Sequence, residues 1–62
     1  MKVYEKITEY IERNNVSAEQ LAKITGITLK DIKTILDGGK VLHADELREI
    51  CIALNVKPEI FL

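Results

Sequence analysis

The cationic side chains of this sequence gather between positions 23 and 40. In this range four lysines outnumber Asp31 and Asp37, a local excess of two positive charges: Lys23, Lys30, Lys33 and Lys40. Residues 41–62 carry an excess of two negative charges. Ammonium groups pair with the phosphates of nucleic acids, so such a cluster is typical of a phosphate-binding surface. This separation of positive and negative charge along the chain is weak, and the whole chain has a formal net charge of −1 and an isoelectric point near 5.7.

Few other groups offer chemistry. Because Cys51 is the one cysteine of the chain, an internal disulfide is excluded. Cys51 and the one histidine, His43, are also too few for a structural zinc site, which needs about four ligands. There is no nucleophile–base pair and no glycine-rich phosphate loop, so we expect no enzymatic activity, cofactor or small-molecule ligand. Cys51 shares an apolar stripe with Ile50 and Leu54, which predicts a buried, unreactive thiol. His43 is expected to be exposed or to cap a helix.

Size and composition favour one small domain over residues 1–62. Hydrophobic residues make up 47% of the chain and charged residues 31%, a balance typical of a folded core rather than of disorder. No apolar run reaches the roughly 20 residues of a membrane span, and the N-terminus is amphipathic rather than signal-like. We therefore expect a cytoplasmic protein without a membrane segment.

Hydrophobic periodicity predicts an all-α fold of four to five short helices. The first helix ends at Asn14-Asn15, because asparagine tolerates turn conformations, and its apolar positions are Val3, Ile7, Tyr10 and Ile11. A later helix is expected from about Ala44 to Leu54, on the repeat Leu47, Ile50, Cys51 and Leu54. A last turn from Pro58 to Leu62 has proline where the first turn of a helix accepts it.

Between these elements a second helix is predicted to start at Ser17. Ser17-Ala18-Glu19-Gln20 forms a capping box, in which the serine and glutamine side chains each bond the other residue's backbone N–H. Val16 and Leu21 fit a hydrophobic staple around this cap. Gly26 ends the helix, because glycine adopts a left-handed backbone without steric cost. The expected buried side consists of Leu21, Ala22 and Ile24.

A third helix follows after a turn of only a few residues. Thr28 is its expected cap, Asp31 in its first turn complements the helix dipole, and Asp37-Gly38-Gly39 ends it. Its inward stripe consists of Ile32, Ile35 and Leu36. Two helices joined by a short glycine-containing turn form a helix–turn–helix, here from Ser17 to Gly38. A generic helical hairpin has the same periodicity, so the pattern alone is only modest support for DNA binding.

Several short motifs accompany this pair of helices. They are Val16-Ser17, Leu21-Ala22, Thr25-Gly26-Ile27-Thr28, Ile32, Ile35-Leu36-Asp37-Gly38, Leu47, Ile50, Ala53-Leu54-Asn55-Val56 and Pro58. Their combined spacing, from about Ile7 to Phe61, resembles the phage-repressor-like, or Xre/Cro-like, helix–turn–helix family. The resemblance implies a compact lambda-repressor-like domain and a DNA-binding transcriptional regulator, usually a repressor, that binds a two-fold operator as a homodimer.

The resemblance also implies which residues contact double-stranded DNA. The helix from 28 to 37 would lie in the major groove with five residues toward the bases: Thr28, Leu29, Lys30, Lys33 and Thr34. Lys30 or Lys33 would bond guanine O6 and N7, and Thr28 and Leu29 would meet a thymine methyl group. Ser17 and nearby backbone N–H groups would hold a phosphate, and Lys40 would add a contact to the DNA backbone.

The sequence departs from the family pattern at several positions. Ala18 stands where members commonly have a phosphate-binding glutamine, and Leu29 where a polar base-reading residue is frequent. Three roles remain open for Leu29: it covers an edge of the core, it contacts a methyl group in the DNA groove, or it belongs to a protein interface. Gly38-Gly39-Lys40 has one more glycine than the usual turn, and Leu42-His43 replaces a common proline–serine pair, so the fourth helix is expected to lack a strong cap. Ala18, Leu29 and the acidic balance support a second hypothesis, an antirepressor- or antitoxin-like protein-interaction module without DNA binding.

Apolar residues near the C-terminus indicate a self-association surface. Ile52 lies about 100° around its helix from Cys51, on a side where a monomer favours polar residues. Together with Phe61 and Leu62 it predicts a homodimer interface. A single exposed isoleucine without a function is the alternative interpretation.

Overall fold

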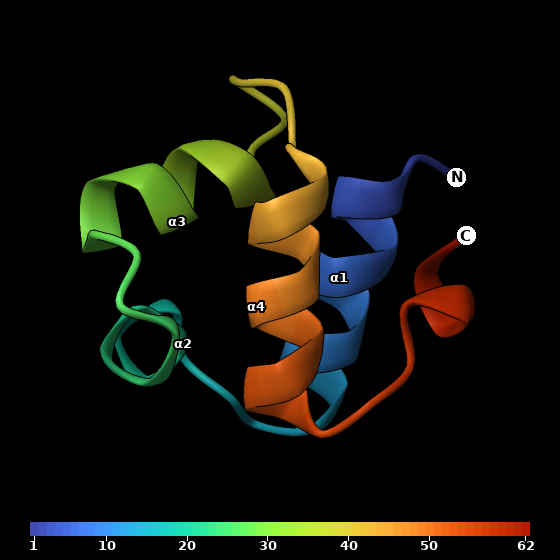
Figure 1. The fold of residues 1–62 in the computed structure, drawn as a ribbon, viewed down its shortest axis with the longest axis horizontal. Coiled ribbons are helices and arrows are strands. Elements are labelled where there is room, and N and C mark those ends of the chain that lie inside the picture. Colours follow the sequence, from blue (N-terminus) through green and yellow to red (C-terminus); the bar gives the residue numbers. More distant parts are fainter.

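The structure, a computed structural model, describes residues 1–62 and is entirely helical. Its elements are α1 (Val3–Arg13), α2 (Ala18–Thr25), α3 (Leu29–Leu36), α4 (Ala44–Leu54) and the 3-10 turn η1 (Pro58–Phe61). This order confirms the predicted all-α fold of four to five helices. In Figure 1, α2 is seen nearly end-on, so it runs across the direction of α4, and the two chain termini lie near each other. No helix combines the length and the apolar character needed to cross a membrane.

The helix–turn–helix pair forms where its local signals predict. Ser17 Oγ accepts from the Gln20 backbone N–H at 3.0 Å, and Gln20 Oε1 accepts from the Ser17 backbone N–H at 2.8 Å. Gly26 ends α2 with φ +79°, a conformation that favours glycine. Thr28 Oγ1 then accepts from the Asp31 backbone N–H at 3.2 Å and caps α3. Three residues therefore suffice to end one helix and start the next.

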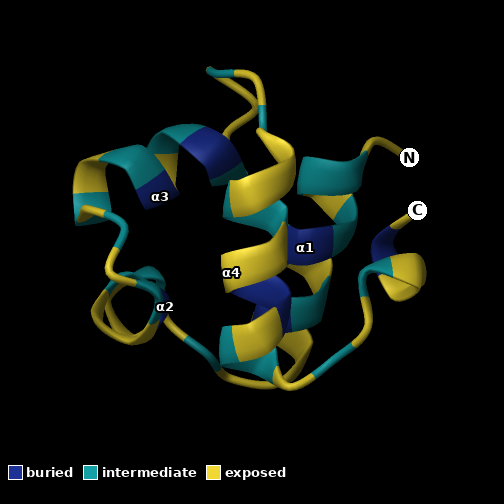
Figure 2. Ribbon diagram, in the orientation of Figure 1, coloured by how far each residue is buried: buried dark blue, intermediate teal, exposed yellow.

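A small core joins all five elements. Figure 2 shows buried positions on the inner sides of α1, α3 and α4 and in the final turn. The core residues are Ile7, Ile11, Leu21, Ile32, Ile35, Ile50, Cys51 and Phe61. Within this arrangement α2 packs against α3 and α4, whereas α1 packs against α3 and η1. Burial of a large aliphatic side chain stabilises the fold by about 1.5–3 kcal/mol, so Leu21, Ile32 and Ile35 hold the α2–α3 pair in place.

Two apolar residues lie elsewhere than predicted. Ile24 is 63% exposed, so its assignment to the buried side of α2 is wrong. The inward face of α2 is the i, i+3, i+4, i+7 row, and Ile24 lies roughly 100° away from the middle of that row. Phe61 is buried, because η1 folds back so that the Phe61 ring meets Tyr10 edge-on, with ring centroids 5.7 Å apart. Phe61 therefore cannot belong to an exposed dimer interface.

The end of α3 is fastened to α1. Gly38 has φ +75°, and the Tyr4 ring lies so close to it that a Cβ atom would have no room. Thr8 Oγ1 lies 2.9 Å from the Tyr4 carbonyl oxygen and 3.2 Å from the Leu36 carbonyl oxygen, so its one proton is shared between α1 and the end of α3. These contacts set the orientation of α3 relative to α1, in addition to the core residues between the two helices.

Candidate nucleic-acid interface

Both helices of the pair begin with backbone N–H groups that the protein itself leaves free. In α2 the capping box occupies the Gln20 N–H, and no protein atom accepts from the N–H groups of Ala18 and Glu19. In α3 the Thr28 hydroxyl occupies the Asp31 N–H in the same way. Unpaired N–H groups and the positive end of the helix dipole attract an anion such as a phosphate.

The predicted hydroxyl groups differ in what they can offer to DNA. Ser17 Oγ and Thr28 Oγ1 accept hydrogen bonds from backbone N–H groups, so their hydroxyl protons remain available for a phosphate oxygen. Thr34 Oγ1 instead donates to the Lys30 carbonyl oxygen at 2.9 Å. The hydroxyl proton of Thr34 is therefore already bonded, and Thr34 Oγ1 can only accept a hydrogen bond from a ligand. Ser17 and Thr28 are exposed, whereas Thr34 is half-buried.

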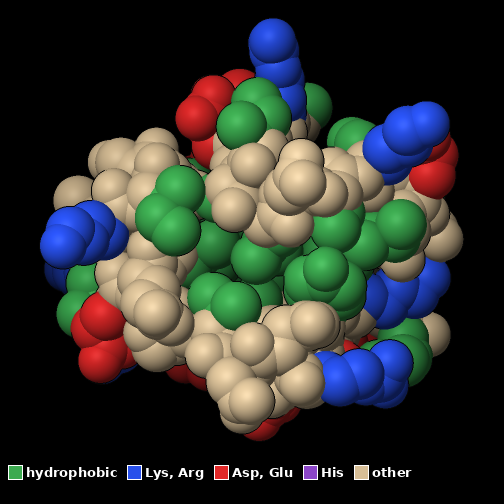
Figure 3. Space-filling view, turned by 90° about the horizontal axis from the view of Figure 1, so that it is seen from below, with side chains coloured by type: hydrophobic (Ala, Val, Ile, Leu, Met, Phe, Trp, Pro, Cys, Tyr) green, Lys and Arg blue, Asp and Glu red, His purple; other side chains and the backbone are tan.

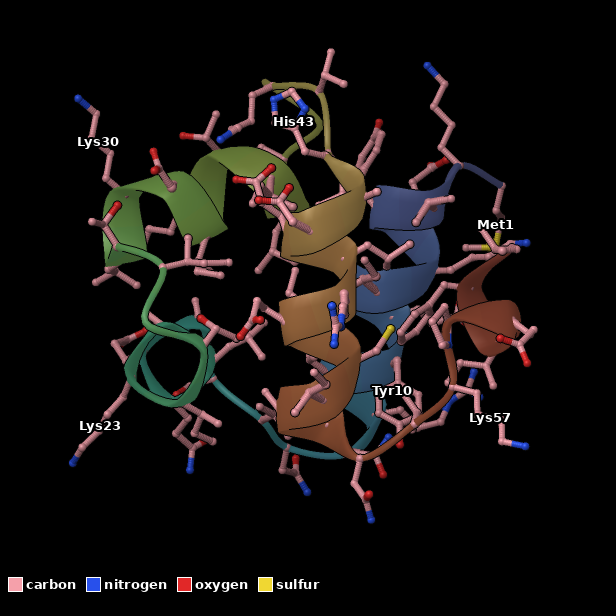
Figure 4. The ribbon with its side chains drawn as sticks, in the orientation of Figure 1. Met1, Tyr10, Lys23, Lys30, His43 and Lys57 are labelled. Carbon is pink, nitrogen blue, oxygen red and sulfur yellow. The ribbon has the colours of Figure 1, made fainter.

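Three lysines near the two helices carry unpaired charge. Lys23, Lys30 and Lys33 are exposed, and none of them forms an ion pair. Figure 4 shows Lys30 at the start of α3 and Lys23 on α2 extending outward from the same side of the molecule, while Lys57 extends from the opposite side. The sequence pattern assigns no DNA contact to Lys23, and the fold places it on the same side of the molecule as Lys30.

Comparison with known families identifies the arrangement. Residues 6–60 match the Cro/C1-type helix-turn-helix DNA-binding domain, which covers nearly the whole chain. The chain belongs to this family. Comparisons with curated proteins and with solved structures gave no match. The Cro/C1-type domain accounts for the capped α2–α3 pair and for a DNA-binding regulator as the general class of this protein.

Within this Cro/C1-type domain, Lys40 differs from the other lysines. Its Nζ lies 2.9 Å from Glu46 Oε2, and the two side chains are 29% and 16% exposed. The hydrogen bond to Glu46 raises the pKa of Lys40 above its ordinary value, and the nearby carboxylates of Asp31 and Asp45 act in the same direction. A contact of Lys40 with the DNA backbone remains a prediction, but its charge is already balanced by Glu46.

The start of α4 has a feature that the sequence analysis missed. Glu46 Oε1 accepts from the His43 backbone N–H at 3.0 Å, so the carboxylate supplies the half of a capping box that reaches back. This bond and the Lys40 ammonium lower the pKa of Glu46. His43 makes no side-chain cap hydrogen bond, as the missing serine predicts, and the bond from Glu46 is the part of the cap that the sequence pattern did not predict. His43 is exposed at the cap position, as predicted.

The predicted apolar site residues also lie in different surroundings. Leu29 is half-buried on α3. Ile52 and Leu62 are 62% and 71% exposed, and Ile52 borders a shallow hollow together with Val56. Cys51 is buried, as predicted. Burial together with the charge of Glu59 raises the pKa of its thiol, which lowers the fraction of the reactive thiolate.

A second surface of the molecule is apolar. Figure 3 shows apolar side chains gathered in the middle of the face seen from below, with charged side chains around its margin. A hollow of about 390 Å³ lies on the molecule between α1, α2 and α4. It is lined by Tyr10, Asn14, Asn15, Val16, Gln20, Leu21, Ile24, Ala53 and Leu54. Six of its nine lining residues are hydrophobic, three are polar amides and none is charged, so the hollow offers no cation to a phosphate.

Replacement of Glu46 by glutamine tests the Lys40–Glu46 contact. Because its pKa is lowered on folding, the Glu46 carboxylate stabilises the fold above its ordinary pKa of 4.5, and this contribution is lost as the pH falls through the lowered value. Glu46→Gln should therefore unfold at less urea than the wild type near neutral pH. The difference should shrink in acid, where the wild-type carboxylate is protonated as well.

Glu49→Gln is the matched control. It makes the same charge change on the same helix at an exposed residue without an ion-pair partner. Its urea midpoint should follow that of the wild type at every pH. Equal midpoints for Glu46→Gln and Glu49→Gln across the titration would contradict a stabilising role for Glu46.

Proposed function

We propose that this protein is a sequence-specific transcriptional regulator, acting as a repressor, that reads the major groove of double-stranded DNA with α3. The observation that carries the proposal is the coincidence of three unpaired lysines with free helix-terminal N–H groups on the α2–α3 pair. Phosphate contacts supply much of the affinity of such complexes, and this surface holds three of the unpaired cations of the chain. Repression requires only that the bound protein occludes its site.

Each part of the surface has a separate role in the proposed complex. The N-terminal half of α3 enters the groove, so that Lys30 and Lys33 reach guanine O6 and N7. Ser17 and the free N–H groups of Ala18 and Glu19 hold a phosphate at the start of α2. These backbone donors replace the glutamine side chain that is frequent at position 18 in the family.

The proposal includes a homodimer on a two-fold operator. Half-sites in such operators lie about 34 Å apart, so the two copies of α3 must be kept well separated. The molecule is 23 Å across its longest axis, so an interface formed by α3 itself would bring the reading helices too close. Ile52 on α4 and Leu62 at the C-terminus are exposed apolar residues outside α3, which supports an interface away from the reading helix.

One observation favours a second candidate function. The uncharged hollow between α1, α2 and α4, with Ile24 exposed at its side, has the apolar character of a protein-binding site. A protein-interaction module, such as an antirepressor or an antitoxin-like partner, would use this hollow and would not require the lysines of α3. The absence of any duplex binding at low salt would favour this candidate over the first.

The reading role of α3 is tested by alanine replacements. The double variant Lys30→Ala, Lys33→Ala should bind random-sequence duplex at least about tenfold more weakly than the wild type in about 50 mM salt. The wild-type affinity should itself fall about tenfold or more between about 50 and 200 mM salt, and the double variant should show a shallower dependence because it neutralises fewer phosphates. Fluorescence anisotropy of a labelled duplex measures both.

Lys57→Ala provides the control for that experiment. It removes one charge from the opposite side of the molecule. Salt screens the interaction between two charges beyond about 10 Å, so Lys57 should contribute little to the binding of DNA at α3. Because Lys57 lines the same hollow as Ile52, the variant must first sediment like the wild type. Its affinity for DNA and its salt dependence should then match the wild type. Equal loss of affinity in Lys57→Ala and in the α3 variants would mean that net charge rather than α3 determines binding.

The dimer is tested by sedimentation of two aspartate variants. The wild type should sediment as a dimer, and Ile52→Asp as a monomer, because a charge in an apolar interface loses its hydration without gaining a partner. Ile24→Asp changes an equally exposed isoleucine on α2 and should remain dimeric. A monomeric wild type, or dissociation only in Ile24→Asp, would contradict the proposed interface.

A further inference from the structure

We infer that Glu46 competes with DNA for the ammonium group of Lys40 and thereby lowers the affinity of the protein for duplexes of any sequence. The inference rests on the proposed function, because α3 in the major groove brings the turn after α3 near the DNA backbone. It departs from the contact between Lys40 and DNA that the family resemblance implies, since it assigns that ammonium group to a carboxylate of the protein itself.

The backbone on the Lys40 side of the ion pair is fixed by the end of α3. The Gly38 backbone N–H donates to the Ile35 carbonyl oxygen at 3.1 Å. The Gly39 N–H donates to the Thr34 carbonyl oxygen at 2.9 Å. The turn that leads to Lys40 is therefore tied back to α3, which places the lysine beside the start of α4.

The carboxylate on the other side of the ion pair is fixed at the start of α4. Glu46 Oε1 accepts from the His43 backbone N–H at 3.0 Å, while Glu46 Oε2 lies 2.9 Å from Lys40 Nζ. The bond to His43 therefore holds the second oxygen in place for the ammonium group. Only 16% of the Glu46 side chain is exposed, so water replaces Lys40 poorly if the ammonium group leaves.

Other carboxylates also oppose a movement of Lys40 to a phosphate. The hydrogen bond to Glu46 raises the pKa of Lys40, and the charges of Asp31 on α3 and Asp45 on α4 act in the same direction. Three carboxylates thus act on one ammonium group. A phosphate that took Lys40 from Glu46 would approach these carboxylates, and like charges repel each other. Lys33, by contrast, forms no ion pair within the protein.

The number of phosphate contacts determines how strongly the protein binds DNA of any sequence. Each lysine that neutralises a phosphate makes the slope of log K against log salt steeper by about 0.9, and it carries no sequence information. Because Glu46 holds Lys40, the complex has one such contact fewer. Binding then depends more on the contacts of α3 with the base edges, which differ between sequences.

Neutralisation of Glu46 tests this competition. Glu46→Gln can still accept from the His43 N–H, because glutamine also serves in a capping box, and it releases Lys40. It should bind random-sequence duplex at least about threefold more tightly than the wild type in about 50 mM salt, with a slope steeper by about 0.9. Fluorescence anisotropy measures both, after circular dichroism has established that the variant is folded under the same conditions.

Glu49→Gln is the matched control for the charge change. It neutralises an exposed residue of the same helix that has no ion-pair partner, so it should keep the wild-type slope. The double variant Lys40→Gln, Glu46→Gln should keep the wild-type slope as well, because it releases no ammonium group.

Two single variants make the test independent of the stability of Glu46→Gln. Lys40→Gln should have the slope of the wild type, because Glu46 holds the ammonium group in the free and in the bound protein. Lys33→Gln should have a slope shallower by about 0.9, because the unpaired Lys33 neutralises a phosphate.

The outcomes separate the role of Glu46 from the proposed function. A slope shallower by about 0.9 in Lys40→Gln would mean that Lys40 already contacts a phosphate, which overturns the inference but leaves DNA binding intact. Equal affinities and slopes in Glu46→Gln and Glu49→Gln overturn it in the same way. If neither the wild type nor any variant binds duplex, the proposed function is wrong, and the competition for Lys40 with it.

Discussion

The three-residue turn between α2 and α3 determines how the two helices of the pair are placed relative to each other. Gly26 can end α2 there because its left-handed backbone carries no steric penalty, and Thr28 caps α3 two residues later. Such a short turn leaves the two helices little freedom, and the burial of Leu21 and Ile32 removes the rest. The free N–H groups and the unpaired lysines are therefore held on one rigid unit rather than on separate flexible segments.

The electrostatics explain how an acidic chain can carry a DNA-binding domain. A net charge of −1 describes the whole molecule, whereas a phosphate responds mainly to charges within about 10 Å. The fold sorts the lysines into two groups, because Lys40 is paired with Glu46 at the start of α4 and Lys30 and Lys33 are unpaired on α3. One cation therefore stabilises the α3–α4 connection, and the others remain available for a ligand.

The sequence predicts the helices well because their signals are local. Ser17 and Gln20, for example, bond within one helical turn, and the structure contains both bonds. The errors involve tertiary contacts. Phe61 is buried because η1 folds back onto α1, and Ile24 is exposed because packing against α3 and α4 selects a different face of α2. Which lysines are unpaired depended on the fold in the same way, so residue types suggested the site but not its available charges.

A residue-by-residue map of where duplex DNA contacts the folded chain tests whether the α2–α3 pair reads DNA. Amide chemical shifts of the labelled protein, recorded while a duplex is added at low salt, provide this map. If the α2–α3 pair reads DNA, the largest changes are expected at residues 17–20 and 28–34, with little change in η1 at the far side of the molecule. Changes centred on η1 or on the hollow beside Ile24, with α3 unaffected, would contradict the claim that the α2–α3 pair reads DNA.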